Sequence, residues 1–219
     1  LLISSGALIT NDYDIRIEGN WTNAIGEAGF DEGEGRVIIW GGNYPQYCFS
    51  NETFYELELN KMWGGTFCID GYDILCEAYD WTSGEIEVIS GTFTANTLID
   101  DGIFGNLYVH SDGTINLSNY SGWIDLNCDL TFTDGGTINI YGGTSDSYWT
   151  YGGDVHVSMN AGSLNFHDRG IFLFNSGNSL TTNITGGTIK TAGGFYGNLT
   201  GFNPTGGIIE CKTSTDGVI

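Results

Sequence analysis

Basic residues and long apolar runs are scarce in this chain, and each of these two shortages excludes a class of protein. The 219 residues hold 6 Lys and Arg against 27 Asp and Glu, for a formal net charge of −21, and only 2 Pro. Such a surface repels phosphate backbones, so we expect no nucleic-acid partner. The chain has no apolar run long enough for a transmembrane helix, so nothing predicts membrane insertion. Helix signals are also missing, because no stretch combines a 3.6-residue apolar period with caps.

What the chain has instead is a recurring sequence motif, called here the glycine phrase, in which a glycine precedes a short run of β-forming residues. Among the 35 glycines, the copies of this phrase start at Gly6, Gly35, Gly65, Gly84, Gly113, Gly136, Gly162, Gly187 and Gly207. From the first copy to the last the mean interval is near 25 residues. A period of that size in an all-β pattern is typical of a solenoid, in which each repeat buries its apolar side against its neighbours.

Two all-β architectures fit this pattern, an antiparallel sandwich of hairpins and a parallel β-helix. Second strands with period-two alternation, such as residues 14–18 and 55–59, lie between the glycine phrases. Most repeats lack a mirrored partner strand at hairpin distance, and like segments recur in the same order. The sequence therefore predicts an all-β parallel β-helix of about eight or nine rungs, with a mean rung near 25 residues.

Neither end of the chain carries a polar capping unit, which a solenoid needs to shield its last rung. We interpret residues 1–219 as a single β-solenoid segment and as a fragment of a longer repeat protein. Open strand edges at both ends recruit further strands. We therefore expect either continuation of the same chain or end-to-end stacking of identical copies.

The five cysteines contain no Cys-x-x-Cys pair, so the sequence does not signal a zinc knuckle. Cys48 and Cys68 lie about one rung apart in the sequence. Two interpretations stay open for this pair: a disulfide between neighbouring rungs, or unpaired thiols that serve as small buried side chains.

Two pairs of aspartates are candidate calcium ligands. Asp12 and Asp14 are separated by one residue, and Asp70 and Asp73 by two. Neither pair matches the EF-hand loop or the glycine-rich calcium repeat. We expect no cofactor beyond a structural calcium at these positions.

The 14% aromatic content includes one dense group, Tyr148, Trp149 and Tyr151. Exposed planar rings on a stiff rod form a platform that can stack on sugar rings, so these three residues are candidate glycan ligands. The competing interpretation is that such rings cover the ends of rungs or seal the core.

No catalytic residue is predicted. Neighbouring acids such as Asp100 and Asp101 point to opposite faces if they lie in a strand, so adjacency does not make a catalytic pair. His167, Asp168 and Arg169 form the one cluster of mixed acid–base character, and we interpret that cluster as an exposed turn between strands rather than a catalytic site.

Residues 15–61 resemble a known repeat. The residues of this chain that carry the resemblance are Gly-Asn-Trp-Thr-Asn at 19–23, a Gly-x-Gly motif at 33–35 and Thr-Phe-Tyr-Glu-Leu-Glu-Leu-Asn-Lys at 53–61. The known repeat is the β-solenoid repeat of large secreted, adhesin-like surface proteins of Bacteroidetes-type bacteria. The resemblance implies an extracellular solenoid exported by the type IX pathway through a separate C-terminal domain. Glu56 and Glu58 stand where this family often has Asn and Thr, and Cys48 stands where it often has Ile. The family has no common catalytic residues.

The expected function is a non-enzymatic extracellular structural or adhesive module of a bacterial surface or filament protein. The alternative is a carbohydrate-binding or carbohydrate-active β-helix, similar to polysaccharide lyases and hydrolases. The partners expected on either hypothesis are glycans or other copies of the chain stacked end to end.

Overall fold

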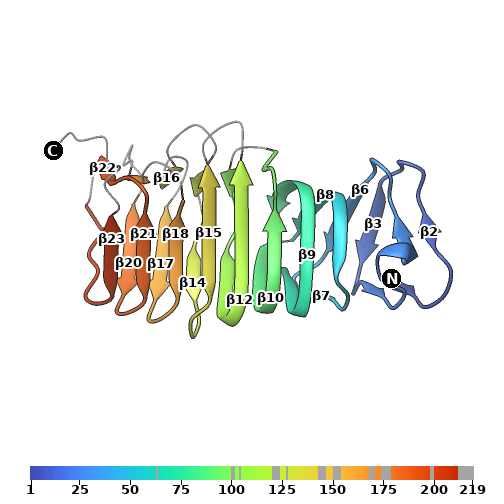
Figure 1. The fold of residues 1–219 in the computed structure, drawn as a ribbon, viewed down its shortest axis with the longest axis horizontal. Helices are drawn as coiled ribbons and strands as arrows, with labels where there is room; N and C mark the ends of the chain where they lie inside the picture. Colours follow the sequence, from blue (N-terminus) through green and yellow to red (C-terminus); the bar gives the residue numbers. More distant parts are fainter. Residues whose placement is uncertain are drawn as a thin grey trace.

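The structure is a computed structural model, and it describes residues 1–62, 64–99, 102–103, 105–119, 124–126, 128–142, 147–149, 154–167, 171–173, 179–197 and 200–211. The strands stack into a parallel β-solenoid of about eight turns, with roughly 22 residues per turn. Figure 1 shows the turns side by side along the long axis of the molecule. Every ladder in this part of the chain is parallel, which confirms the predicted parallel β-helix over the antiparallel sandwich.

Each turn contributes strands to three faces in a fixed order. The first face holds β1 (Leu2–Ile3), β4 (Thr22–Asn23), β7 (Gln46–Cys48), β14 (Leu130–Phe132), β17 (Val155–Met159), β20 (Leu180–Ile184) and the first limbs of the long strands β9 (Thr66–Ser83), β10 (Glu85–Ala95) and β12 (Leu107–Asn119). The second face holds β2 (Leu8–Ile9), β5 (Phe30–Asp31), β15 (Thr137–Gly142), β18 (Ser163–Phe166), β21 (Thr188–Thr191), β23 (Ile208–Cys211), the first limb of β8 (Glu52–Lys61) and later limbs of β9, β10 and β12. The third face holds β3 (Ile15–Glu18), β6 (Arg36–Gly41), β11 (Gly102–Ile103), β13 (Asp125–Leu126), β16 (Ser147–Trp149), β19 (Ile171–Leu173), β22 (Phe195–Gly197) and the last limbs of β8 and β9.

Glycine forms the corner between the first and second faces. Gly91 has φ of 87° and is in register with Gly113 of the next turn. A Cβ at Gly91 would collide with the backbone of Tyr72 in the preceding turn. Because a left-handed backbone is costly for residues with a Cβ, glycine is favoured where the chain bends here. From Gly113 onwards, the recurring phrase is a corner glycine followed by a strand of the second face.

The interior is filled by rows of apolar side chains, with one member in each turn. On the second face, Phe93, Ile115, Ile138, Leu164 and Ile189 occupy equivalent register positions and are all almost fully buried. These rows belong to one continuous cluster of buried residues. Each turn therefore buries its apolar side against its neighbours, as the repeat pattern indicates.

Within the described residues, the helical structure is a single 3-10 turn, η1 (Glu27–Gly29), between β4 and β5. None of the helical structure described is long and apolar enough to cross a bilayer. The near-absence of helix agrees with the missing helix signals in the sequence. The position of η1 matters for function, because it places Glu27 beside the corner between the first and second faces.

Candidate functional site

Of the three aromatics predicted to stack on sugars, the structure describes Tyr148 and Trp149, which belong to the third face. Tyr148 and Trp149 lie in β16, whose backbone pairs with β13 on one side and β19 on the other. Tyr151 lies outside the described residues. The glycan-stacking hypothesis for these residues stays a prediction.

Of the acid–base cluster, His167 is described, whereas Asp168 and Arg169 lie outside the described residues. The His167 ring stacks on Tyr141, with centroids 4.2 Å apart, and its Nε2 lies 3.0 Å from Oδ1 of Asn139. Both contacts are made to the preceding turn, so His167 takes part in the packing between turns.

Asp12 and Asp14, the first pair of predicted calcium ligands, bind the backbone of the following turn. Oδ1 of Asp12 accepts a hydrogen bond from the N–H of Glu34 at 2.8 Å. Oδ1 of Asp14 accepts one from the N–H of Arg36 at 3.1 Å. These carboxylates therefore link turns of the solenoid.

Asp70 and Asp73, the second pair, also make contacts between turns. Oδ1 of Asp70 accepts a hydrogen bond from the Ser90 hydroxyl at 2.7 Å, and the N–H of Asp73 donates to Oδ1 of Asn51 at 2.8 Å. Within the described residues, no three His, Cys, Asp or Glu side chains gather in a group that could hold a metal ion. A structural calcium at the four aspartates stays a prediction.

Cys48 and Cys68 are free thiols in the structure, and the register of the ladder explains why they do not pair. Cys48 is in register with Ile69, and Tyr47 with Cys68. Because successive residues of a strand point to opposite sides, Cys48 faces the core while Cys68 faces outwards, with Sγ 3.6 Å from the Glu87 carboxylate. Burial raises the pKa of each thiol to about 12, so both are protonated at neutral pH. Of the two alternatives left open by the sequence, the structure has the unpaired thiols.

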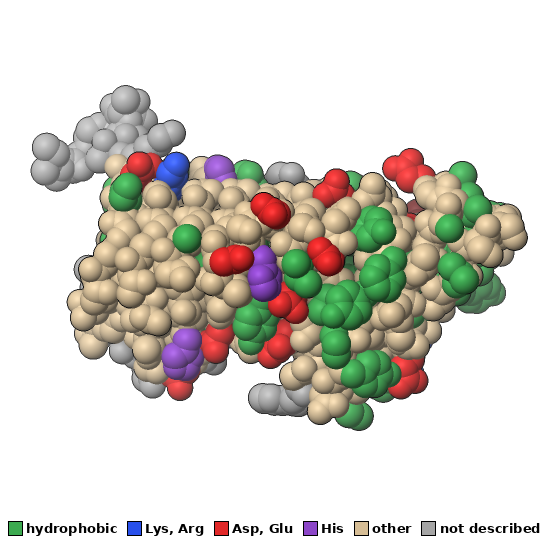
Figure 2. All heavy atoms as spheres, turned by 90° about the horizontal axis from the view of Figure 1, so that it is seen from below, with side chains coloured by type: hydrophobic (Ala, Val, Ile, Leu, Met, Phe, Trp, Pro, Cys, Tyr) green, Lys and Arg blue, Asp and Glu red, His purple; other side chains and the backbone are tan. Residues whose placement is uncertain are grey.

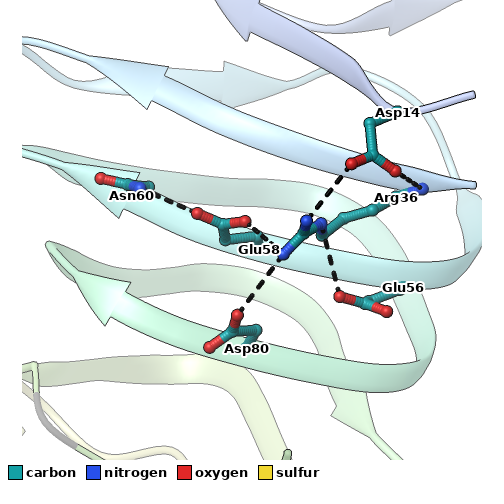
Figure 3. A network of polar contacts seen from close by, with 6 residues as sticks. All are labelled: Asp14, Arg36, Glu56, Glu58, Asn60 and Asp80. Atoms are coloured by element: carbon teal, nitrogen blue, oxygen red, sulfur yellow. Dashed lines mark hydrogen bonds and ion pairs between the residues drawn. The ribbon is translucent and has the colours of Figure 1, made fainter.

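Arg36 joins carboxylates from neighbouring turns on the outside of the third face (Figure 3). Its Nη1 lies 2.8 Å from Glu58 and 3.7 Å from Asp80, its Nη2 lies 3.2 Å from Asp14, and its Nε lies 3.5 Å from Glu56. One cation thus faces four carboxylates. Like charges this close repel one another, so the arrangement depends on Arg36.

The two glutamates of this network differ in their surroundings. Glu58 is buried, and its Oε1 accepts a hydrogen bond from Nδ2 of Asn60 at 2.8 Å. Glu56 is half-buried, and burial raises the pKa of its carboxyl group, although Arg36 opposes the shift. Glu56 therefore keeps its proton to a higher pH than an exposed glutamate, which is the property that a general acid needs.

An open groove follows the corner between the first and second faces from β4 to β10, and we call it the corner groove. It consists of two hollows, of about 450 and 560 Å³, which share Glu27 and Asn51. The groove is lined by Asn23, Ala24, Ile25, Gly26, Glu27, Phe49, Ser50, Asn51, Glu52, Thr53, Tyr72, Asp73, Ile74, Leu75, Thr92 and Thr94.

The parallel register builds one wall of the corner groove from outward side chains of successive turns. Thr53 of β8 pairs with Leu75 of β9, which pairs with Thr94 of β10. Beside this row, Asp73 pairs with Thr92. Since a strand alternates its faces, the two rows point outwards together and offer hydroxyl and carboxylate groups to a ligand.

Aromatic rings stand at one end of the corner groove. Phe49 lines it with 41% of its surface exposed, and Tyr72 lies half-buried in the next turn. The Phe49 ring stacks on Tyr47, with centroids 5.5 Å apart and an interplanar angle of 9°. Figure 2 shows hydrophobic side chains gathered beside acidic ones on the underside of the molecule, nearer the N-terminal end. The groove thus combines exposed ring surface with hydrogen-bonding groups.

Of the residues that line the corner groove, Asp73 alone is among the predicted site residues. The sequence does carry a signal for the others, because Asn51 and Asp73 are 22 residues apart, which is one turn. Residues spaced by one turn on the same face lie next to each other in a solenoid. That spacing becomes informative only when the length of each turn is known.

Beyond the corner groove, the second face continues as two outward rows. One row contains Thr92, Thr114, Thr137, Ser163 and Thr188, and the other contains Thr94, Asn116, Asn139, Asn165 and Lys190. The amides of the second row bind one another, because Nδ2 of Asn139 donates to Asn116 at 2.8 Å and Nδ2 of Asn165 donates to Asn139 at 2.9 Å. We call this chain of bonds the amide ladder, and it links successive turns.

Comparisons of the chain with protein-family models, with curated proteins and with solved structures found no match. The functional conclusion therefore rests on the geometry and charge of the described residues and on the repeat that residues 15–61 resemble.

Proposed function

We propose that this chain is a non-enzymatic structural and adhesive module of a large extracellular bacterial surface or filament protein. The observation that carries the proposal is a continuous parallel stack with an open groove on its outside, lined by both polar and aromatic side chains. A stack of turns is quasi-one-dimensional, and it can hold a binding surface at a distance from the structure that anchors it.

Contacts between turns support the structural half of the proposal. Arg36 ties β6 to its neighbours, and the amide ladder ties together β12, β15 and β18. These polar links add to the backbone ladders, so bending or separating the turns requires many bonds to break together. Stiffness of this kind is useful in a spacer.

The extracellular placement, the bacterial source and type IX export all belong to the proposal. They rest on the resemblance of residues 15–61 to repeats of secreted surface proteins. The charge of −21 is compatible with that setting, because net charge of one sign keeps an extended surface soluble and discourages association with nucleic acid.

The experiment that tests this proposal measures retention and turnover together. Purified residues 1–219 are immobilised and exposed to neutral, basic and acidic polysaccharides, and the bound material is recovered and analysed by mass spectrometry. We expect at least one polysaccharide to be retained and recovered at its original length. Release of shortened or unsaturated products contradicts the non-enzymatic assignment. Failure to retain any polysaccharide contradicts adhesion to glycans.

The second candidate function is a carbohydrate-active enzyme, and the network around Arg36 is the observation that favours it. Glycosidases use pairs of carboxyl groups in which one keeps its proton, and burial raises the pKa of Glu56 beside the Glu58 and Asp80 carboxylates. If this candidate is correct, the products detected in the same experiment disappear in Glu56→Gln, while Glu34→Gln, at an exposed position outside the network, leaves them unchanged.

A further inference from the structure

The charged side chains that line the corner groove are all carboxylates. Glu27 and Asp73 are exposed carboxylates that line it, Glu52 is a buried one, and no Lys or Arg is among the described residues that line it. Glu52 is already engaged, because its Oε1 accepts hydrogen bonds from Nε1 of Trp21 and from the hydroxyl of Ser50, both at 2.9 Å. Glu27 and Asp73 therefore supply the charge that a ligand meets, and electrostatic complementarity favours a cationic ligand over an anionic one.

The aromatic rings that line the corner groove restrict further which ligands the groove can bind. Phe49 offers an exposed ring face, held in place by stacking on Tyr47, and Tyr72 lines the same hollow. Such rings contribute large, rigid apolar area at low conformational cost. A pyranose ring has an apolar face that packs on an aromatic ring, and it carries hydroxyl groups at its edge. Asn51, Thr53 and Thr94 offer amide and hydroxyl partners for such groups.

The length of the corner groove fits an oligomer better than a single sugar. Its lining comes from four successive turns, represented by Glu27, Asn51, Asp73 and Thr92. Neighbouring strands lie about 4.8 Å apart, so these positions span roughly 14 Å along the solenoid axis. The groove is open along its side, which lets a linear polymer lie in it without a free end.

We propose that the corner groove binds a linear polysaccharide of amino sugars, of the glucosamine type. One sugar ring packs on Phe49, and protonated amines of neighbouring sugars face Glu27 and Asp73. This inference deepens the proposed adhesive function, on which it rests, by assigning the surface that makes the contact and the class of glycan bound.

The test compares the affinity of residues 1–219 for four hexasaccharides by calorimetry: glucosamine, N-acetylglucosamine, glucose with β-1,4 links, and galacturonic acid. The pH is chosen so that the glucosamine amines are protonated. We expect the glucosamine hexamer to bind most tightly, the two neutral hexamers to bind more weakly, and the acidic hexamer not to bind. Affinity for the neutral or acidic hexamer equal to that for glucosamine would overturn the assignment.

Variants separate the corner groove from the charge of the whole molecule. Phe49→Ala and the pair Glu27→Gln with Asp73→Asn should each weaken binding of the glucosamine hexamer about tenfold. Phe49→Tyr keeps the ring and should bind like the unchanged chain. The matched control, Glu34→Gln with Asp112→Asn, removes the same charge at exposed positions outside the groove and should change affinity less than twofold. Tyr13→Ala removes an aromatic that is 75% exposed elsewhere and should have no effect.

A cationic peptide distinguishes recognition of the sugar from attraction by charge. If oligolysine of equal charge binds as tightly as the glucosamine hexamer, and Phe49→Ala does not weaken the hexamer, the groove does not recognise an amino sugar and the inference is wrong. Retention of another glycan with an affinity that Phe49→Ala leaves unchanged would also overturn the inference, but it would leave the adhesive function standing. Circular dichroism of each variant checks that the fold is intact.

Discussion

Tyr79 lies in the core between Trp81 and Phe93, and its hydroxyl group is buried without a hydrogen-bond partner. A buried polar group without a partner costs about 1–3 kcal/mol. Tyr79→Phe should therefore raise the free energy of unfolding by about 1 kcal/mol, measured by urea denaturation. Tyr108→Phe is the matched control, since the Tyr108 hydroxyl is bonded to Asn106, and it should give no gain. A loss of stability in Tyr79→Phe would show that this hydroxyl finds a partner in solution.

Glu56 and Glu58 both contact Arg36, yet we expect opposite consequences when each is replaced by glutamine. Glu58 is buried and accepts bonds from Arg36 and Asn60, both at 2.8 Å. Hydrogen bonds to charged groups contribute more than neutral ones, so Glu58→Gln should lower the free energy of unfolding by about 2 kcal/mol at pH 7. Urea denaturation of both variants measures the difference.

The pKa of Glu56 determines whether Glu56→Gln raises or lowers the free energy of unfolding. Burial raises the pKa of Glu56 in the folded state, so ionising this group costs stability as the pH rises through that range. Glu56→Gln removes this cost. At pH 7 we expect stability equal to that of the unchanged chain or higher by about 0.5 kcal/mol. The advantage should vanish below about pH 4.3, the value for an unfolded glutamate, where both states are protonated. A variant that is less stable at pH 7 and recovers at low pH contradicts this sign.

The amide ladder joins neighbouring strands, and it gives unequal roles to asparagines that look alike in the sequence. The Asn139 side chain donates to Asn116 and accepts from Asn165. Asn165 donates to Asn139, but its own Oδ1 is buried without a partner. In the next turn the equivalent residue is Lys190, which lies 3.6 Å from Glu210. The ladder therefore ends at Asn165.

We expect Asn139→Ala to destabilise the chain more than Asn165→Ala. The first change breaks both ladder bonds of Asn139 and the contact of its Oδ1 with Nε2 of His167, and it leaves the Asn165 amide unpaired, for a cost of about 2 kcal/mol. The second change breaks one bond and removes an unpaired acceptor, so its cost should stay below about 1 kcal/mol. Thermal unfolding of the two variants under the same conditions decides the order, and equal losses would mean that the ladder is not formed in solution.

The repeat and the parallel fold could be predicted from the sequence, but the length of a turn could be predicted only in part. From Gly113 onwards, each glycine phrase marks the same corner, so the spacing of the copies gives the turn directly. Gly6 marks the same corner before β2, but Gly35 precedes a strand of the third face, and Gly65 and Gly84 precede strands of the first. The intervals from Gly6 to Gly35, from Gly35 to Gly65 and from Gly84 to Gly113 are therefore each one turn plus one face, which is why the predicted mean of 25 exceeds the roughly 22 residues observed.

The corner groove could not be predicted in the same way. Its four turns are represented by Glu27, Asn51, Asp73 and Thr92, which are 24, 22 and 19 residues apart, so their juxtaposition depends on register. Phe49 illustrates the difficulty, because nothing in its local sequence distinguishes an exposed ring from a buried one. Cys48 and Cys68 show the same limit, since a shift of one register position decides whether two side chains share a face.

The net charge of −21 should make the free energy of unfolding depend on salt. Repulsion among surface carboxylates opposes compaction, and the Debye length falls from about 30 to 3 Å between about 0.01 and 1 M salt. We expect the urea midpoint of unfolding to rise with sodium chloride over this range. The variant Glu34→Gln with Asp112→Asn, which carries two charges fewer, should show a smaller rise. A midpoint that falls with salt would mean that attractive pairs, such as those of Arg36, outweigh the repulsion.

We propose that this acidic solenoid holds a glycan in its corner groove without altering it. The most direct measurement is calorimetric titration of residues 1–219 with the glucosamine hexamer, followed by mass spectrometry of the hexamer recovered from the complex. We expect saturable binding that Phe49→Ala weakens about tenfold, and a hexamer of unchanged mass. Absence of binding, or recovery of shortened or unsaturated oligomers, would contradict the claim.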